Sequence, residues 1–232
     1  MTKSRTTTSR RIGVESSATR ALLIDAAKRV IQKYGYAALT SRRVAAEAGQ
    51  KPQLVHYYFR TMDDLMLALV RSGGDETLKR LARAVASKDP LRAIWKLSMD
   101  PTATVVTMEI MAVANHNDLI RAEARRYAEQ YRNVQAEAIA QYLENVGIKA
   151  AIPPVVATLM TAGISQVLLR EKALGMTLGH RELESGVEAW QEEFQKKVRS
   201  LQAASTAKKH PPAGSANRAS RRRRKLNSRG GS

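Results

Sequence analysis

The sequence predicts an all-α protein of about nine helices, in which an N-terminal three-helix helix-turn-helix domain precedes a larger helical domain. Apolar residues recur at helical spacing through most of the chain, whereas no stretch shows the alternating pattern of a half-buried strand. Prolines open and glycines close many of these stretches, as is typical of helix boundaries. These observations together favour a chain built from helices alone.

The charge of the chain is large and unevenly spread. The 232 residues carry a net charge of +18, with +3 in residues 1–19, +5 in residues 20–71, +1 in residues 72–201 and +9 in residues 202–232. Positive charge at both ends and near the N-terminus indicates a polyanionic partner, and the neutral middle indicates a part that packs on itself. The absence of cysteine excludes disulfides and thiolate metal sites.

Neither a membrane span nor a secretory signal is predicted. No apolar run is long enough to cross a bilayer, and the first residues lack the apolar core of a signal peptide. We therefore expect a soluble cytoplasmic protein with no membrane partner.

Residues 1–35 predict a basic arm and a first helix. Residues 1–18 are rich in Thr, Ser and Arg without an apolar period, so we expect a disordered arm. Its Arg5, Arg10 and Arg11 either lie along nucleic-acid phosphates or are merely solvated, and both interpretations stay open. A helix is expected from about Thr19 to Tyr34, with Gly35 as its stop.

Residues 40–59 predict two short helices joined by a tight turn. Thr40 is placed as the N-cap of the first helix, and Gly49 supplies the turn. Pro52 suits the first turn of the second helix, where its missing amide hydrogen has no cost. Val55 and Phe59, four residues apart, give that helix an inward face. Its outward face is left with donors and acceptors suited to bases and phosphates: Lys51, Gln53, His56 and Tyr57.

From Thr19 to Leu65 the chain resembles the DNA-binding domain of the TetR (tetracycline-repressor) family of transcriptional regulators. The resemblance is carried, in the family's order and spacing, by Ala26-Ala27, Gly35, Leu39-Thr40, Val44-Ala45, Ala48-Gly49, Tyr57-Tyr58-Phe59 and Leu65. It implies that the second short helix enters the major groove of double-stranded DNA. A lysine usual after the phenylalanine falls on Met62, and Arg60 is expected to replace it.

The resemblance gives the residues at 40–60 two roles. We expect Lys51, Gln53 and Tyr57 to contact bases in the major groove. Phosphate contacts are expected from Thr40, Arg42, Arg43, His56 and Arg60.

The remaining apolar patterns predict six further helices, over about residues 62–87, 90–99, 101–114, 119–145, 153–175 and 180–201. Gly73-Gly74 interrupts the first of these, because each glycine within a helix costs ~1 kcal/mol relative to alanine. The pair marks either a hinge that lets a ligand move the DNA-binding domain or a local break between two helices. We favour the local break.

By resemblance, residues 66–201 form a domain that binds an effector and dimerises, with the last two long helices in a four-helix interface. The helices that surround the family's cavity carry candidate ligand residues, although residues at such spacing are more often ordinary core. The candidates are Trp95, Met99, Met108, Met111, His116, Tyr127, Tyr131 and Met160. The neutral charge and apolar lining favour a small hydrophobic effector.

No pattern indicates an enzyme, a metal site or a cofactor. The four histidines are too dispersed for a metal motif, and no glycine-rich phosphate loop occurs. The sequence thus predicts a homodimeric regulator with four segments: a basic arm (1–18), a DNA-binding domain (19–65), an effector-binding and dimerisation domain (66–201) and a disordered basic tail (202–232). We expect a repressor that leaves an inverted-repeat operator when its effector binds. Two alternatives stay open: a nonspecific nucleoid or RNA-binding protein that acts through its basic tails, and a helical enzyme that turns over a substrate in the middle domain.

Overall fold

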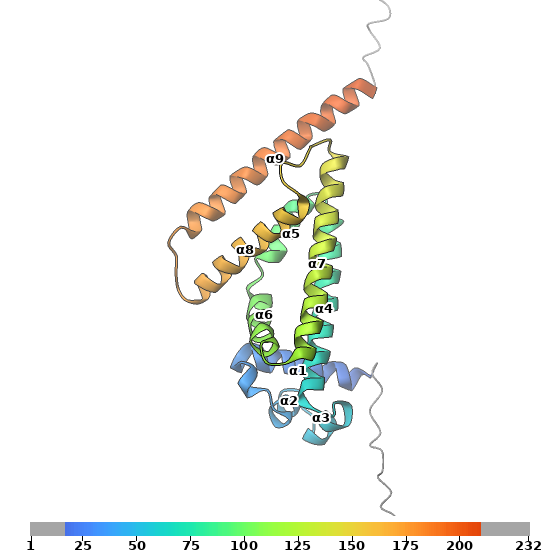
Figure 1. Cartoon of the computed structure of the whole chain (residues 1–232), viewed down its shortest axis with the longest axis vertical. Coiled ribbons are helices and arrows are strands. Elements are labelled where there is room, and N and C mark those ends of the chain that lie inside the picture. The colour runs from blue at the N-terminus through green and yellow to red at the C-terminus, as the bar shows by residue number, and fades with distance from the viewer. Residues whose placement is uncertain (1–16, 210–232) are drawn as a thin grey trace, which may run out of the picture. The chain divides into compact units, whose positions relative to one another are not determined.

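The computed structural model describes residues 17–209, which form nine α-helices, one short 3-10 helix and no strand (Figure 1). The predicted all-α class is therefore confirmed. Residues 1–16 of the expected arm and residues 210–232 of the expected tail lie outside this range. The helices are α1 (Ala18–Tyr34), η1 (Tyr36–Ala38), α2 (Ser41–Glu47), α3 (Pro52–Tyr58), α4 (Met62–Val85), α5 (Pro90–Ser98), α6 (Pro101–Ala114), α7 (Asp118–Asn145), α8 (Pro154–Ala173) and α9 (His180–Lys209).

Side-chain caps fix where the early helices begin. The Thr40 hydroxyl accepts a hydrogen bond from the Arg43 amide at 3.3 Å, which confirms Thr40 as the N-cap of α2. Lys51 provides no side-chain cap for α3, and Pro52 occupies the first helical turn as predicted. A reciprocal pair of 3.0 Å hydrogen bonds between Thr61 and Asp64 starts α4.

The described chain divides into two compact units. The first comprises residues 17–140 and 151–177, and the second comprises residues 141–150 and 178–209. The first unit therefore contains α1–α6, all of α8 and α7 up to residue 140. Helix α9 and the end of α7 belong to the second unit.

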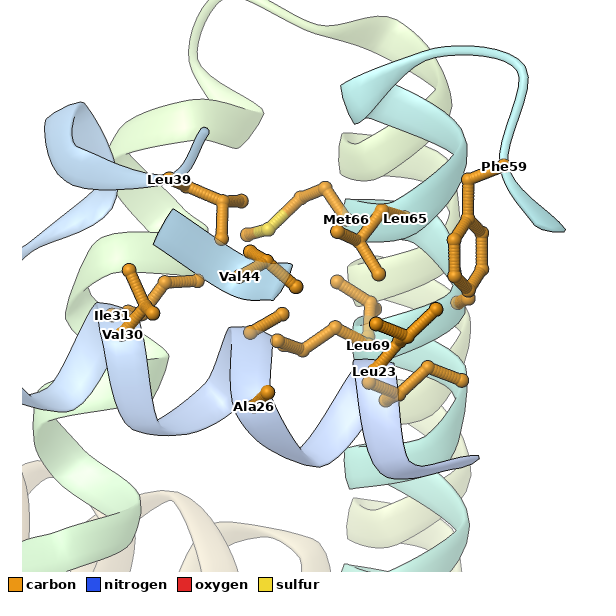
Figure 2. Close-up of a cluster of buried hydrophobic side chains, with 14 of the residues drawn as sticks. Leu23, Ala26, Val30, Ile31, Leu39, Val44, Phe59, Leu65, Met66 and Leu69 are labelled. Atoms are coloured by element: carbon orange, nitrogen blue, oxygen red, sulfur yellow. The ribbon is translucent and has the colours of Figure 1, made fainter. Parts of the chain in front are cut away.

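The core of the first unit lies between α1, α2, α3 and the start of α4. Leu23, Val30, Val44 and Leu65 are fully buried there, and Met66 of α4 fills the space beside Val44 (Figure 2). Burying side chains of this size contributes about 1.5–3 kcal/mol each relative to leaving them exposed. The packing holds α2 and α3 rigidly on α1 and α4, so the outer faces of these two short helices are presented in a fixed geometry.

The predicted break at Gly73-Gly74 is wrong, because α4 runs without interruption from Met62 to Val85. The reason lies in tertiary packing. The ring of Tyr127 on α7 lies against Gly74 so closely that a Cβ atom there would be 2.4 Å from the ring carbons Cγ and Cδ1. The Tyr127 hydroxyl also donates to Asp75 Oδ1 at 2.6 Å. Gly74 thus permits a close approach of two helices.

The second unit contains an aromatic cluster. The Phe194 ring stacks on Trp190 at a centroid distance of 5.6 Å and lies 6.3 Å from the Tyr142 ring. The Gln195 side-chain amide donates to the Tyr142 hydroxyl at 3.2 Å. Helix α9 continues to Lys209, so residues 202–209, which we expected to begin the disordered tail, are helical.

Candidate nucleic-acid interface and ligand cavity

The face of α3 that turns away from the core carries the predicted DNA-binding side chains. Val55 and Phe59 are 1% and 3% exposed, which confirms the predicted inward face. Gln53, His56 and Tyr57 are exposed and share the opposite face by their spacing of three and four residues. Lys51 precedes them and is also exposed. Their hydrogen-bonding groups are therefore available to a ligand outside the protein.

The remaining predicted contacts lie beside α3. Thr40, Arg42 and Arg43 at the start of α2 are exposed, as is Arg60 just after α3. The Arg43 guanidinium lies 5.0 Å from the centre of the Tyr34 ring, which restricts its orientation. All eight residues selected from the sequence are thus exposed on or next to α2 and α3.

Residues that the sequence analysis did not select orient this surface. The Glu47 carboxylate of α2 accepts hydrogen bonds from Lys33 Nζ at 3.0 Å and Arg29 Nε at 2.8 Å, both on α1. These bonds, Lys33 first, lower the pKa of Glu47. Tyr58 meets Tyr57 edge to face at 5.0 Å, which restricts the orientation of the exposed Tyr57 ring. Such long-range partners cannot be assigned from spacing along the chain.

Helix α6 makes a direct polar contact with the segment that follows the first helix. Glu109 Oε2 accepts a hydrogen bond at 3.0 Å from the backbone amide of Tyr36, the first residue of η1. A Cβ atom at the preceding Gly35 would lie 3.4 Å from Glu109 Oε1, and Gly35 has a positive φ of 75°. Glu109 therefore links α6 to the connection between α1 and α2.

Removing the Glu109 carboxylate should measurably weaken the first unit. We expect Glu109→Ala to lower the free energy of unfolding by about 1–3 kcal/mol, because the part-buried Tyr36 amide loses its partner. Urea denaturation followed by helical circular dichroism measures the change. Glu109→Gln keeps a neutral acceptor and should lose less. Equal stability of both variants and the parent would show that this contact contributes nothing.

A cavity of about 370 Å³ lies in the first unit, where the end of α5 and the start of α6 face the end of α8. Its volume is near the lower end of the roughly 300–1,000 Å³ range of small-molecule sites. Most of its lining is apolar, with Thr104 and Lys172 as the polar members. The lining residues are Met99, Pro101, Thr104, Val105, Met108, Leu169, Lys172 and Ala173.

Two of the eight candidate ligand residues, Met99 and Met108, line this cavity. Trp95 and Tyr131 are half-buried but are not among its lining residues, and burial raises the pKa of Tyr131. Tyr127 packs on α4, as described above. The other three candidates, Met111, His116 and Met160, are exposed.

Within residues 17–209 no three His, Asp or Glu side chains are grouped so that they could hold a metal ion. A separate finding concerns hydropathy. None of the helices in this range combines the length and apolar character that crossing a membrane requires.

Comparisons with known proteins bear on α1–α4. The sequence profile of the bacterial regulatory proteins of the tetR family matches residues 23–69, which span α1 from Leu23, then α2, α3 and the start of α4. The HTH-type transcriptional regulator BetI of Rhizobium meliloti (strain 1021) is 26% identical over 132 residues. That alignment covers 53% of this chain and 64% of BetI. Residues 23–69 are therefore similar to the N-terminal domain of the tetR family of bacterial regulatory proteins.

Solved structures show the TetR-like fold beyond the matched residues. A protein from Saccharomonospora viridis, described as a transcriptional regulator and crystallised with choline, superposes with a TM-score of 0.61 at 18% identity. The match covers 68% of this chain and 87% of that one. A TetR transcription regulator from Haloarcula marismortui ATCC 43049 has a TM-score of 0.60 at 19% identity and covers 82% and 97% of the two chains.

The TetR profile and the cavity concern different parts of the chain. Residues 23–69 include all eight predicted DNA-contact residues but none of the cavity lining. The recognised sequence pattern therefore belongs to the DNA-binding part.

Proposed function

We propose that this chain is a TetR-family homodimeric transcriptional repressor that binds an inverted-repeat operator through α3 and is released by a small hydrophobic effector. The observation that carries the proposal is the two-sided character of α3. Its Val55 and Phe59 are buried in the core that the family profile covers, whereas Gln53, His56 and Tyr57 face outward. An outward face of this composition suits base edges in a major groove.

An exposed apolar face on α8 supports dimerisation. Its members recur at helical spacing, so they lie on one side of the helix, and each has 38–55% of its surface exposed: Val155, Val156, Leu159, Met160 and Val167. Gly163 falls in the same stripe, and a Cβ atom there would meet nothing within 4 Å. Apolar surface of this extent is characteristic of protein interfaces, and we propose a second copy as its partner. A dimer is needed to place two copies of α3 about 34 Å apart on a palindrome.

A charged residue at the centre of this face should disrupt the dimer. We expect Leu159→Glu to weaken self-association by at least about 30-fold, because a buried unpaired charge costs about 2–5 kcal/mol. Sedimentation equilibrium measures the change. Leu119→Glu is the matched control, since Leu119 on α7 is 69% exposed and lies outside the α8 face. A Leu159→Glu protein that associates like the parent would contradict the proposed interface.

The cavity supports the proposal that a small effector binds, because its lining is mainly apolar. Helix α6 connects the cavity to the segment between α1 and α2. Pro101, Thr104, Val105 and Met108 of α6 line the cavity, and Glu109 of the same helix bonds to the Tyr36 amide. A ligand that shifts α6 would therefore alter the hydrogen bond between Glu109 and the Tyr36 amide, and with it the connection between α1 and α2. A ligand can move the equilibrium only by its differential affinity for the two states.

The experiment that tests the proposal is competitive DNA binding by the full-length protein. Fluorescence anisotropy is measured with the duplex upstream of its own coding sequence, in the presence of excess scrambled duplex and over a series of salt concentrations. Retained binding to the specific duplex, at two chains per site, supports the proposal. Equal binding to both duplexes, lost when residues 210–232 are removed, would instead favour the nonspecific nucleic-acid-binding alternative.

A further inference from the structure

The polar groups of the cavity are arranged asymmetrically. The apolar part is formed by Met99, Val105, Met108 and Leu169, which leaves few groups to solvate a polar ligand. Thr104 is buried, and its hydroxyl donates to the backbone oxygen of Asp100 at 3.3 Å. The polar part of a ligand therefore finds few hydrogen-bonding partners among these residues.

Lys172 is the one lining residue, among those the structure describes, that carries a formal charge. It lies in the last turn of α8 and is exposed to solvent. An ammonium group has three N–H donors and can bind a ligand in addition to the interaction that it already makes.

The neighbouring acidic group is already compensated. Asp100 caps α6 and accepts hydrogen bonds from the Thr102 hydroxyl and, at 2.5 Å, from Arg80. Hydrogen bonding, from Thr102 first and then Arg80, lowers the pKa of Asp100 to about 2. Its carboxylate is thus ionised at neutral pH and paired with Arg80, and Asp100 is not among the lining residues, whereas Lys172 is.

From this charge pattern we infer that the cavity binds an amphipathic anion: an alkyl chain fills the apolar part and a carboxylate pairs with Lys172. The inference rests on the proposed effector-regulated function and names the ligand class. A neutral alcohol lacks the partner for Lys172. A cationic headgroup would be repelled by it.

Three probes with the same ten-carbon chain separate these possibilities: decanoate, decan-1-ol and decyltrimethylammonium. Isothermal titration calorimetry with the full-length protein, below the micelle concentration of each probe, measures the dissociation constants. We expect decanoate to bind about 3- to 10-fold more tightly than decan-1-ol, the range for a charge-assisted contact at a solvent-exposed site. Decyltrimethylammonium should bind most weakly.

Substitution of Lys172 tests whether this residue sets the preference. Lys172→Met should remove the difference between decanoate and decan-1-ol, and Lys172→Glu should reverse the order so that decyltrimethylammonium binds more tightly than decanoate. Lys149→Glu is the control, because Lys149 is exposed and outside the lining. Thermal unfolding of each variant confirms that it is folded.

Equal affinity for the three probes, no binding of any probe, or an unchanged order in Lys172→Glu would each overturn the inference. Its failure is distinguishable from failure of the proposed function. Specific operator binding without decanoate binding would leave the regulator proposal intact and remove only the ligand class. Loss of specific operator binding would contradict the regulator proposal whatever the cavity binds.

Discussion

Gly74→Ala is expected to destabilise the first unit, although alanine is the better helix former. An added Cβ atom would lie 2.4 Å from two ring carbons of Tyr127 and 2.6 Å from a third, so the ring must move. That movement breaks the 2.6 Å hydrogen bond from the Tyr127 hydroxyl to Asp75 and the stacking of Arg126 on the ring at 4.1 Å. Overpacking of this kind costs about 1–3 kcal/mol.

The loss of the Tyr127 hydrogen bond adds about 1 kcal/mol, and the gain in helix propensity returns a similar amount. We therefore expect the free energy of unfolding to fall by about 1–3 kcal/mol. Urea denaturation followed by circular dichroism measures the fall.

The adjacent glycine supplies the control. A Cβ atom at Gly73 would meet nothing within 4 Å, so Gly73→Ala should raise stability by about 0.5–1 kcal/mol. In the double variant Gly74→Ala/Tyr127→Ala, the destabilisation should be smaller than the sum of the two single effects, because the clash is absent. Stabilisation by both alanine substitutions would contradict the close packing of α4 against α7.

The double variant Lys51→Ala/Tyr57→Phe is expected to lower operator affinity by at least about 30-fold, because it removes two outward donors of α3 and each good base contact contributes about 1–3 kcal/mol. Phenylalanine keeps the ring that packs edge to face on Tyr58 and removes only the hydroxyl. Lys51 precedes Pro52 and caps nothing with its side chain, so alanine there should leave α3 intact. Fluorescence anisotropy with the specific and the scrambled duplex measures both affinities.

Salt dependence separates the two kinds of contact in this variant. If Lys51 binds a phosphate, the slope of log affinity against log salt falls by ~0.9 and binding weakens equally on both duplexes. If it reads a base, the preference for the specific duplex falls instead. Lys88→Ala, in the loop between α4 and α5, is the control for loss of one exposed lysine. Unchanged affinity and preference in the double variant would contradict the assigned role of α3.

Local signals explain why the helix-turn-helix could be predicted closely. The Thr40 cap, the Pro52 start and the inward pair Val55 and Phe59 act within a few residues, and the structure has each of them as predicted. Helix boundaries from α5 to α8 followed from prolines and polar turns in the same way.

Tertiary contacts explain what the sequence could not give. From the sequence alone, Gly74 is predicted to break a helix. In the structure it packs against Tyr127, which lies on a helix far along the chain, and no residue near Gly74 in the sequence indicates that contact. The cavity likewise joins the start of α6 to the end of α8, so Leu169 and Lys172 were not selected, whereas exposed Met111 and Met160 were. Helical spacing identifies an apolar residue but not the space into which it points.

The most direct test of the central claim, that α3 reads an inverted repeat, is hydroxyl-radical footprinting of the full-length protein on the DNA upstream of its own coding sequence. We expect two protected half-sites about one helical turn apart with two-fold symmetry. The footprint should disappear in Lys51→Ala/Tyr57→Phe and persist in Lys88→Ala. Uniform protection without half-sites, equal in the parent and the double variant, would contradict that claim.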